Sequence, residues 1–244
     1  MGDLQRGTAL VTGASSGIGA AVAAALAGQG WRVICAARRV DKLATLARTI
    51  GQGAVAIALD VSDAGSVGSL AERLPDGWRE VDLLVNNAGH DVGGRRRFDR
   101  GSIEDWATTV QTNAIGMMRV THALLPGMVE RGRGHIVNIG SIAALDVQPG
   151  GAAYVTSKFA VNGFSQALRA DFKGKGVRVT QILPGLVRTE FAETRWAGDT
   201  ARAEEFYGKF PVVLDAADVA RAVVYAAEQP PHVTIAELVV VTSA

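Results

Sequence analysis

The chain has 244 residues, of which 48% are hydrophobic and 20% charged, so it is long enough for one substantial domain with a buried core. Its 25 basic and 24 acidic residues give a net charge of +1, which indicates neither a nucleic-acid partner nor an anionic membrane surface. The single cysteine, Cys35, excludes an internal disulfide and favours a reducing compartment, and no apolar segment predicts a signal peptide or a membrane span. We therefore expect a cytoplasmic protein with a single domain over residues 1–244.

The first elements predict a βαβ unit. An apolar run, Thr8–Val11, precedes the glycine-rich stretch Thr12–Gly19, and an alanine-rich run over residues 20–27 follows it. The glycines let the backbone turn sharply beside a ligand, and free amides at the start of the helix would face an anion. A glycine-rich stretch can be only a turn, but residues 31–36 predict a second strand that completes the unit.

The end of the second predicted strand bears on the choice of cofactor. In a dinucleotide site, an acidic residue roughly 20 positions beyond the glycines holds the adenosine ribose. This chain has Arg38 and Arg39 in that neighbourhood. A carboxylate would repel a 2′-phosphate, whereas a guanidinium group pairs with it. The arginines therefore favour NADP(H) over NAD(H), although two arginines in a loop can also be simply solvated.

Helices and strands continue to alternate along the first half of the chain. Apolar spacing predicts a helix, a strand, a second helix and a fourth strand over residues 40–50, 54–59, 62–74 and 81–85. Ser62 or Asp63 can cap the second of these helices. Parallel strands bind ligands at their carboxyl ends, so Asp60 and the turn Asn86–Gly89 are expected beside the glycine-rich turn. Asp60 is either another capping residue or an acceptor for an adenine amino group, and Asn86–Gly89 can also be an ordinary turn.

The second half of the chain keeps the same alternation. Helices are predicted over residues 102–128, 154–172 and 215–227, and strands over residues 135–139, 178–183 and 235–241. Asn113 lies inside the first of these helices, where its poor helix propensity calls for a reason. The simplest reason is a structural amide that bonds the facing strand.

Tyr154 and Lys158 are the candidate proton-transfer pair. Residues four apart on a helix share one face, so the phenol and the ammonium group are neighbours. A fixed positive charge favours the ionised phenol and would lower a pKa that is ordinarily near ~10. Ser141 follows a predicted strand at the same edge of the sheet. Taken alone, such a pair can be a half-buried aromatic beside a solvated cation, and the serine can be a cap.

Seven motifs, in this order and spacing, resemble those of the short-chain dehydrogenase/reductases. They are Thr12–Gly19, Asp60-Val61, Asn86–Gly89, Asn113, Ser141, Tyr154 with Lys158, and Pro184-Gly185. The resemblance covers essentially the whole chain. It implies an α/β fold, with a single Rossmann-type domain, a doubly wound seven-stranded parallel sheet with helices on both faces, and assembly as a homotetramer.

The resemblance also implies roles for individual residues. Ser141 would bond the substrate carbonyl or alkoxide, Tyr154 would transfer the proton, and Lys158 would lower the pKa of Tyr154 and hold the nicotinamide ribose. Asn113 would hold a water that connects Lys158 to solvent. The implied NADP contacts are Gly13, Ser15, Ser16, Gly17, Ile18, Gly19, Arg38, Arg39, Asp60, Val61, Asn87, Ala88, Gly89, Tyr154, Lys158, Pro184, Gly185, Val187 and Thr189.

The segment over residues 186–213 is a candidate substrate lid. Its pattern is irregular, and its aromatic residues can close over a site or pack an amphipathic helix against the protein's own surface or a partner. Pro184–Phe191, Arg195–Asp199 and Pro230–Ile235 resemble the NADP-dependent 3-hydroxy acid and serine dehydrogenases. By that likeness, Arg195 is a hypothetical partner of a substrate carboxylate or sulfonate, although a lid arginine is more often a surface ion pair. Arg95–Arg97 can meet an anionic substrate or a neighbouring subunit, or be simply solvated.

The sequence therefore predicts an NADP(H)-dependent oxidoreductase that acts on a carbonyl or alcohol, with a small 3-hydroxy acid or semialdehyde as the candidate substrate. The first alternative is a ketoreductase for a bulkier biosynthetic ketone. The second is a non-catalytic dinucleotide sensor or scaffold. The four histidines are scattered along the chain without metal-ligand spacing, so we expect no metal site.

Overall fold

A seven-stranded parallel sheet lies at the centre of the computed structural model, which describes residues 6–243. The strand order is β3-β2-β1-β4-β5-β6-β9, and every neighbouring pair is parallel. The strands are β1 Thr8–Thr12, β2 Arg32–Ala37, β3 Ala54–Ala58, β4 Val81–Asn86, β5 Gly134–Ile139, β6 Val177–Pro184 and β9 Glu237–Val240. The order reverses between β1 and β4, which places a ligand-binding crevice outside the carboxyl ends of these strands. The predicted doubly wound fold is confirmed.

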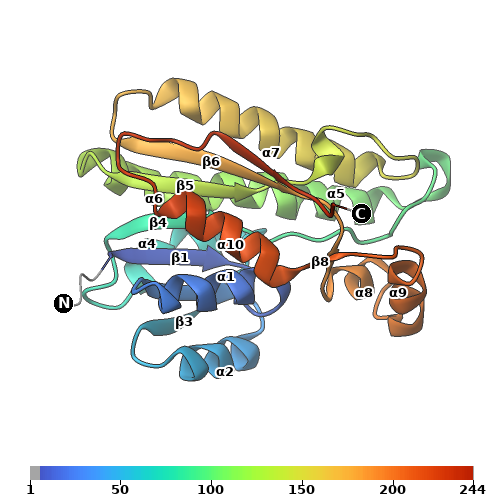
Figure 1. Cartoon of the computed structure of the whole chain (residues 1–244), viewed down its shortest axis with the longest axis horizontal. Helices are drawn as coiled ribbons and strands as arrows, with labels where there is room; N and C mark the ends of the chain where they lie inside the picture. The colour runs from blue at the N-terminus through green and yellow to red at the C-terminus, as the bar shows by residue number, and fades with distance from the viewer. Residues whose placement is uncertain (1–5, 244) are drawn as a thin grey trace.

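Helices cover both faces of the sheet (Figure 1). One face carries α1 Gly17–Gly28, α2 Val40–Ile50 and α10 Ala216–Ala227. The other carries α3 Ala64–Gly68, α4 Leu70–Arg73, α6 Met117–Glu130 and α7 Ala152–Asp171, with α5 Ile103–Val110 packed beside α7. Because both faces are covered, the central strands are continuous apolar runs rather than alternating ones. Residues 6–243 contain no helix with the length and apolar character needed to cross a membrane.

Two predicted helices are interrupted in the structure. The predicted helix over residues 62–74 is broken at Ser69 into α3 and α4, and Asp63 rather than Ser62 caps α3 by accepting a hydrogen bond from the Ser66 amide. The predicted helix over residues 102–128 contains a π-helical segment, η2 Gln111–Gly116, between α5 and α6. Such widened turns are frequent at functional sites. Here the π-helical segment carries Asn113, whose side chain bonds the backbone of a facing loop instead of a strand.

The segment over residues 186–213 is more regular than its sequence predicts. It contains α8 Phe191–Arg195 and α9 Thr200–Tyr207, which share a small apolar core. Its two ends are fastened together by β7 Val187–Arg188 and β8 Leu214–Asp215, which pair in parallel. The remaining short elements are the 3₁₀ turns η1 Phe98–Arg100 and η3 Ile142–Ala144. The segment is therefore a compact unit between β6 and α10 with a small core of its own.

The predicted domain begins at residue 1 and ends at residue 244, and residues 1–5 and 244 lie outside the described part of the chain. The helix predicted over residues 215–227 begins with a reciprocal capping box. The Asp215 side chain accepts a hydrogen bond from the backbone of Asp218, whose own carboxylate accepts one from the Asp215 amide. This local motif fixes where α10 begins.

Candidate active site

A cavity of about 670 Å³ lies at the carboxyl ends of the sheet strands and collects most of the predicted site residues. Its volume is typical of small-molecule and cofactor sites. The residues that line it come mainly from the turn after β1, the ends of β2, β3, β4, β5 and β6, the loop that carries Arg95, the start of α7 and the segment over residues 186–213. Among the predicted site residues, only Gly19 and Asn113 do not line it.

The glycine-rich turn is packed against the turn that follows β4. Gly13 has a φ of +67°, and a Cβ atom there would lie 2.9 Å from the Ala88 Cα. The Thr12 hydroxyl accepts hydrogen bonds from the amides of Asn87 and Ala88 at 2.9 and 3.0 Å. Gly19 has a packing role, because its Cβ would lie 2.4 Å from the Gly13 carbonyl oxygen. The two turns thus form one surface, as their places at strand ends predict.

The two arginines after β2 differ in their partners. Arg39 donates hydrogen bonds to the hydroxyls of Ser15 and Ser16 and forms a 2.7 Å ion pair with Glu190, which also pairs with Lys42. Burial raises the pKa of Glu190, but hydrogen bonds from Lys42, Arg39 and Ser16 outweigh it and lower the pKa to about 2. The Glu190 carboxylate is therefore anionic, and it already pairs with the Arg39 guanidinium group.

Arg38 lines the same cavity and forms no ion pair or side-chain hydrogen bond with residues 6–243. Its charge acts on two neighbours, Asp60 and His90. Burial raises the pKa of Asp60, yet hydrogen bonds from the Ser62 hydroxyl and amide, together with the Arg38 charge, give a net lowering. Asp60 therefore closes a local turn as an anion, and Arg38 is the arginine that is available to a ligand.

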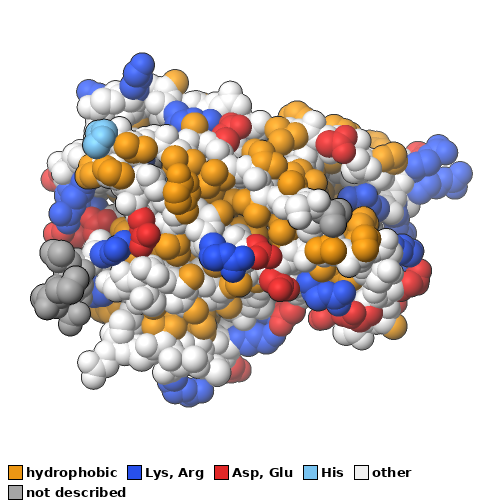
Figure 2. All heavy atoms as spheres, viewed as in Figure 1, with side chains coloured by type: hydrophobic (Ala, Val, Ile, Leu, Met, Phe, Trp, Pro, Cys, Tyr) orange, Lys and Arg blue, Asp and Glu red, His pale blue; other side chains and the backbone are white. Residues whose placement is uncertain are grey.

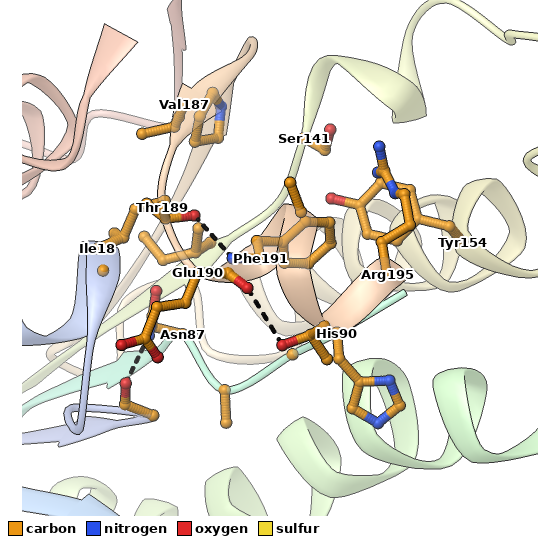
Figure 3. A pocket seen from close by; sticks show the side chains of 18 of the residues that line it. Ile18, Asn87, His90, Ser141, Tyr154, Val187, Thr189, Glu190, Phe191 and Arg195 are labelled. Atoms are coloured by element: carbon orange, nitrogen blue, oxygen red, sulfur yellow. Dashed lines mark hydrogen bonds between the residues drawn. The ribbon is translucent and has the colours of Figure 1, made fainter. Parts of the chain in front are cut away.

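Ser141, Tyr154 and Lys158 meet in the cavity. Ser141 follows β5, and Tyr154 and Lys158 lie on adjacent turns of α7. A hydrogen bond joins the Ser141 and Tyr154 side chains, and Figure 3 shows their hydroxyls on the same side of the cavity. The Lys158 Nζ donates a 3.0 Å hydrogen bond to the Ile139 carbonyl oxygen and lies 5.5 Å from the centroid of the Tyr154 ring. The predicted trio is brought together at the edge of the sheet.

The pKa of Tyr154 moves in the direction opposite to the prediction. Burial is the largest effect and raises the pKa of the phenol, while the hydrogen bond with Ser141 and the charges of Arg195 and Arg95 lower it. The expected lowering of the Tyr154 pKa by Lys158 is wrong in this structure. The physical reason is that Lys158 faces the ring and the Ile139 carbonyl, so burial of the hydroxyl dominates.

Lys158 is itself affected by burial, which lowers its pKa from 10.5 to about 8. The folded chain therefore holds this proton less tightly than the unfolded chain does. The contribution of Lys158 to stability is present above pH 10.5 and is lost as the pH falls through about 8. We expect the free energy of unfolding of cofactor-free wild type, relative to Lys158→Met, to rise between these two pH values. Denaturant titrations across that range measure it, and a flat or falling difference would contradict the assignment.

Asn113 is a structural amide in this structure. Its Oδ1 accepts a hydrogen bond from the His90 amide at 2.9 Å, and its Nδ2 donates to the His90 carbonyl and to the Ser157 hydroxyl at 2.8 and 3.0 Å. These bonds join the π-helical segment to the loop after Gly89 and to α7. They agree with the structural alternative, with the loop in place of a strand. The water that the resemblance assigns to Asn113 stays a prediction.

Pro184 ends β6, Gly185, Val187 and Thr189 follow it, and all four line the cavity. The Tyr207 hydroxyl bonds the carbonyl oxygen of Val187 at 3.0 Å, and it also accepts a 3.2 Å hydrogen bond from the amide of Thr189. A side chain of α9 thereby fixes the backbone of the segment that the resemblance places against the nicotinamide. No local pattern predicts this contact, because 18 to 20 residues separate the partners.

Arg195 forms a buried ion pair that the sequence does not reveal. Its Nε lies 2.7 Å from Asp91 Oδ2, and the two side chains are 7% and 5% exposed. The guanidinium group also lies 5.3 to 5.7 Å from the ring centroids of Phe191, Trp196 and Phe206. Figure 3 shows Arg195 beside Tyr154 and Phe191. The hypothesis that this arginine pairs with substrate is therefore weakened, because Asp91 already neutralises it.

Comparisons with known proteins identify the family. The family model for short chain dehydrogenases matches residues 7–200. Serine 3-dehydrogenase of Agrobacterium fabrum is 40% identical over 233 residues, which are 95% of this chain and 92% of that protein. The NADP-dependent 3-hydroxy acid dehydrogenase YdfG of Escherichia coli is 41% identical over 227 residues, covering 93% and 91%. The closed form of a serine dehydrogenase complexed with NADP+ superposes with a TM-score of 0.93 at 40% identity, covering 96% and 94%. The chain belongs to the short-chain dehydrogenase family.

Proposed function

We propose that this chain is an NADP(H)-dependent oxidoreductase that interconverts a carbonyl and an alcohol, with a small 3-hydroxy acid or its semialdehyde as the substrate class. One observation carries the proposal. A single cavity joins a glycine-rich turn and an unpaired arginine at one end to Ser141, Tyr154 and Lys158 at the other. The named activities of the similar dehydrogenases support the substrate class.

The cavity fits the cofactor. The glycine-rich turn lines the cavity, and at Gly13 a side chain would collide with the facing turn, so glycine there lets the two turns pack together at the floor of the site. The amides at the start of α1 would meet the phosphates, and Arg38 a 2′-phosphate. Lys158 would hold the nicotinamide ribose, and the segment Val187–Thr189 would contact the carboxamide. When bound, the nicotinamide supplies or accepts the hydride.

The chain's own residues then handle orientation and the proton. In the reductive direction, Ser141 orients the carbonyl by donating a hydrogen bond to its oxygen. Tyr154 donates its hydroxyl proton to the same oxygen as the carbonyl carbon is reduced, and recovers a proton from solvent afterwards. Lys158 keeps a positive charge near the phenolate that forms. In the oxidative direction, each proton moves the opposite way.

We propose that the segment over residues 186–213 is a lid over this site. Its ends are joined by β7 and β8, so it is a unit that can move as a whole. The ring of Phe191 meets that of Tyr154 edge-on, with 5.6 Å between the centroids. Closure of the segment would exclude water from the reacting oxygen, which strengthens the hydrogen bonds there.

Homotetrameric assembly and a cytoplasmic location also belong to the proposal. Large apolar side chains are exposed on the helices of one face, including Ile103 and Phe159, and near the edge strand β9, including Val239 and Val241. Figure 2 shows hydrophobic side chains gathered over β9 and α10. Such surfaces support association between copies. The buried, unpaired Cys35 is consistent with a reducing compartment. Light scattering during size-exclusion chromatography measures the mass, and a monomer would contradict the tetramer.

A substrate panel tests the activity. Small 3-hydroxy acids and semialdehydes are compared with bulkier cyclic ketones by the change in NADPH absorbance. We expect the highest kcat/KM with the small acids or semialdehydes. A higher value with the bulky ketones would favour the ketoreductase alternative. Tight NADPH binding without turnover of any compound would favour a sensor.

Arg38→Ala tests the cofactor preference. We expect the Kd for NADPH to rise by about 10- to 100-fold, with a much smaller change for NADH, because the variant loses a charge-assisted bond to the 2′-phosphate. Fluorescence titration measures both constants. Arg48→Ala, on the far end of α2, is the matched control. An equal loss for both cofactors would contradict the role of Arg38.

A further inference from the structure

The cavity holds five cationic side chains within residues 6–243, and four of them already have an assignment. Arg39 is paired with Glu190, and Lys158 bonds the Ile139 carbonyl beside Tyr154. Arg38 lies near Asp60, where the 2′-phosphate of the cofactor would bind, and Arg195 forms an ion pair with Asp91. The fifth cation is Arg95.

Arg95 forms no ion pair and no side-chain hydrogen bond with residues 6–243, although it lines the cavity that contains Tyr154. It lies close enough to Tyr154 for each charge to shift the pKa of the other group. Burial and the nearby Arg195 charge lower the pKa of Arg95, and the opposing effects of Asp91 and Tyr154 offset them only in part. Together Arg95, Arg195 and Asp91 leave one net positive charge beside the phenol.

The loop that carries Arg95 is held in place from two sides. Gly94 has a φ of +66°, and its Cβ would lie 3.2 Å from the Arg195 carbonyl oxygen. On the other side, the Arg96 amide donates a 3.0 Å hydrogen bond to the Gly150 carbonyl. The loop is therefore wedged between the lid segment and the loop before α7. Arg95 is positioned at the cavity, whereas Arg97 is directed to a surface ion pair with Asp99.

We propose that Arg95 is the residue that binds the carboxylate of an anionic substrate, while Asp91 holds Arg195 in a structural role. This inference rests on the proposed oxidoreductase function and names the residue that gives it specificity for acids. A guanidinium group beside Tyr154 and Ser141 can donate two parallel hydrogen bonds to a substrate carboxylate that lies a few bonds away from the reacting carbonyl. The Asp91–Arg195 pair cannot serve this purpose without leaving a buried carboxylate unpaired.

The test compares NADPH-dependent reduction of acetoacetate with that of methyl acetoacetate, its uncharged ester. For Arg95→Ala, we expect the ratio of kcat/KM for the acid to that for the ester to fall by about 10-fold or more, mainly through KM. Arg95→Lys should recover part of the ratio, because lysine keeps the positive charge but cannot donate the two parallel hydrogen bonds of a guanidinium group. Arg96→Ala, one position along the same loop and not lining the cavity, is the matched control and should keep the wild-type ratio.

Two results would overturn the inference and leave the proposed function standing. They are an unchanged ratio in Arg95→Ala, including an equal loss for both compounds, and an equal fall of the ratio in Arg96→Ala. A wild-type enzyme that reduces the ester but not the acid would also reject the carboxylate site alone. A wild-type enzyme that binds NADPH but reduces no carbonyl compound would reject both proposals together.

Discussion

Replacing Tyr154 with phenylalanine is expected to lower kcat by about 10²- to 10⁴-fold and to leave NADPH binding nearly unchanged. The variant removes only the hydroxyl that gives or takes the proton. The ring, which packs edge-on against Phe191 and lies under the Lys158 ammonium group, is kept. Steady-state NADPH oxidation gives kcat, and fluorescence titration gives the Kd of the cofactor.

The matched control for this variant is Tyr225→Phe. Tyr225 lies on α10, is 53% exposed and does not line the cavity, so the same chemical change there should leave both constants unaltered. Turnover by Tyr154→Phe at a rate close to wild type would refute proton transfer by this phenol. If the variant lost cofactor binding as well as turnover, the substitution would have damaged the site rather than removed only the proton donor.

Asp91→Ala is expected to lower the free energy of unfolding by about 3–5 kcal/mol. The substitution leaves the buried Arg195 charge without its carboxylate partner, and the three surrounding rings compensate only in part. The double variant Asp91→Ala/Arg195→Met should recover most of the loss, because it removes the second charge as well. Equilibrium denaturation with urea measures all three proteins.

The ion pair between Asp99 and Arg97 provides the comparison for this prediction. Its side chains are 53% and 80% exposed, so Asp99→Ala should cost less than about 1 kcal/mol. A similar loss for Asp91→Ala and Asp99→Ala would show that burial of the Asp91–Arg195 pair has little energetic consequence. A double variant as unstable as the single one would show that the Asp91 carboxylate acts through something other than Arg195.

Some site features follow from the sequence because they depend on residues close together in the chain. The glycine-rich turn joins β1 directly to α1, so its position needs no tertiary information. Tyr154 and Lys158 share a helix face at a spacing of four residues. Strands covered on both faces are continuous apolar runs, so their positions along the chain can be predicted from the sequence. Parallel pairing then places their carboxyl ends at one edge of the sheet.

The charges of the site were decided by partners distant in sequence. Arg38 and Arg39 are equivalent in the sequence, but only Arg39 forms an ion pair with Glu190, which lies 151 residues away. Arg195 and Arg95 are both candidate anion receptors by composition, but Asp91, 104 residues from Arg195, neutralises the former. The interruption at Asn113 likewise depends on a loop 23 residues earlier. No periodicity encodes such pairs.

By itself the sequence determined the α/β architecture, the glycine-rich turn and the shared helix face of Tyr154 and Lys158, because local spacing and apolar patterning specify these features. Its series of motifs, by their resemblance to a known family, indicated the roles of the serine, the tyrosine and the lysine. Only the tertiary structure decided which cations are free to meet a ligand and in which direction the pKa of Tyr154 moves. The physical reason is that ion pairing and desolvation depend on the atoms that folding brings into contact, wherever those atoms lie along the chain.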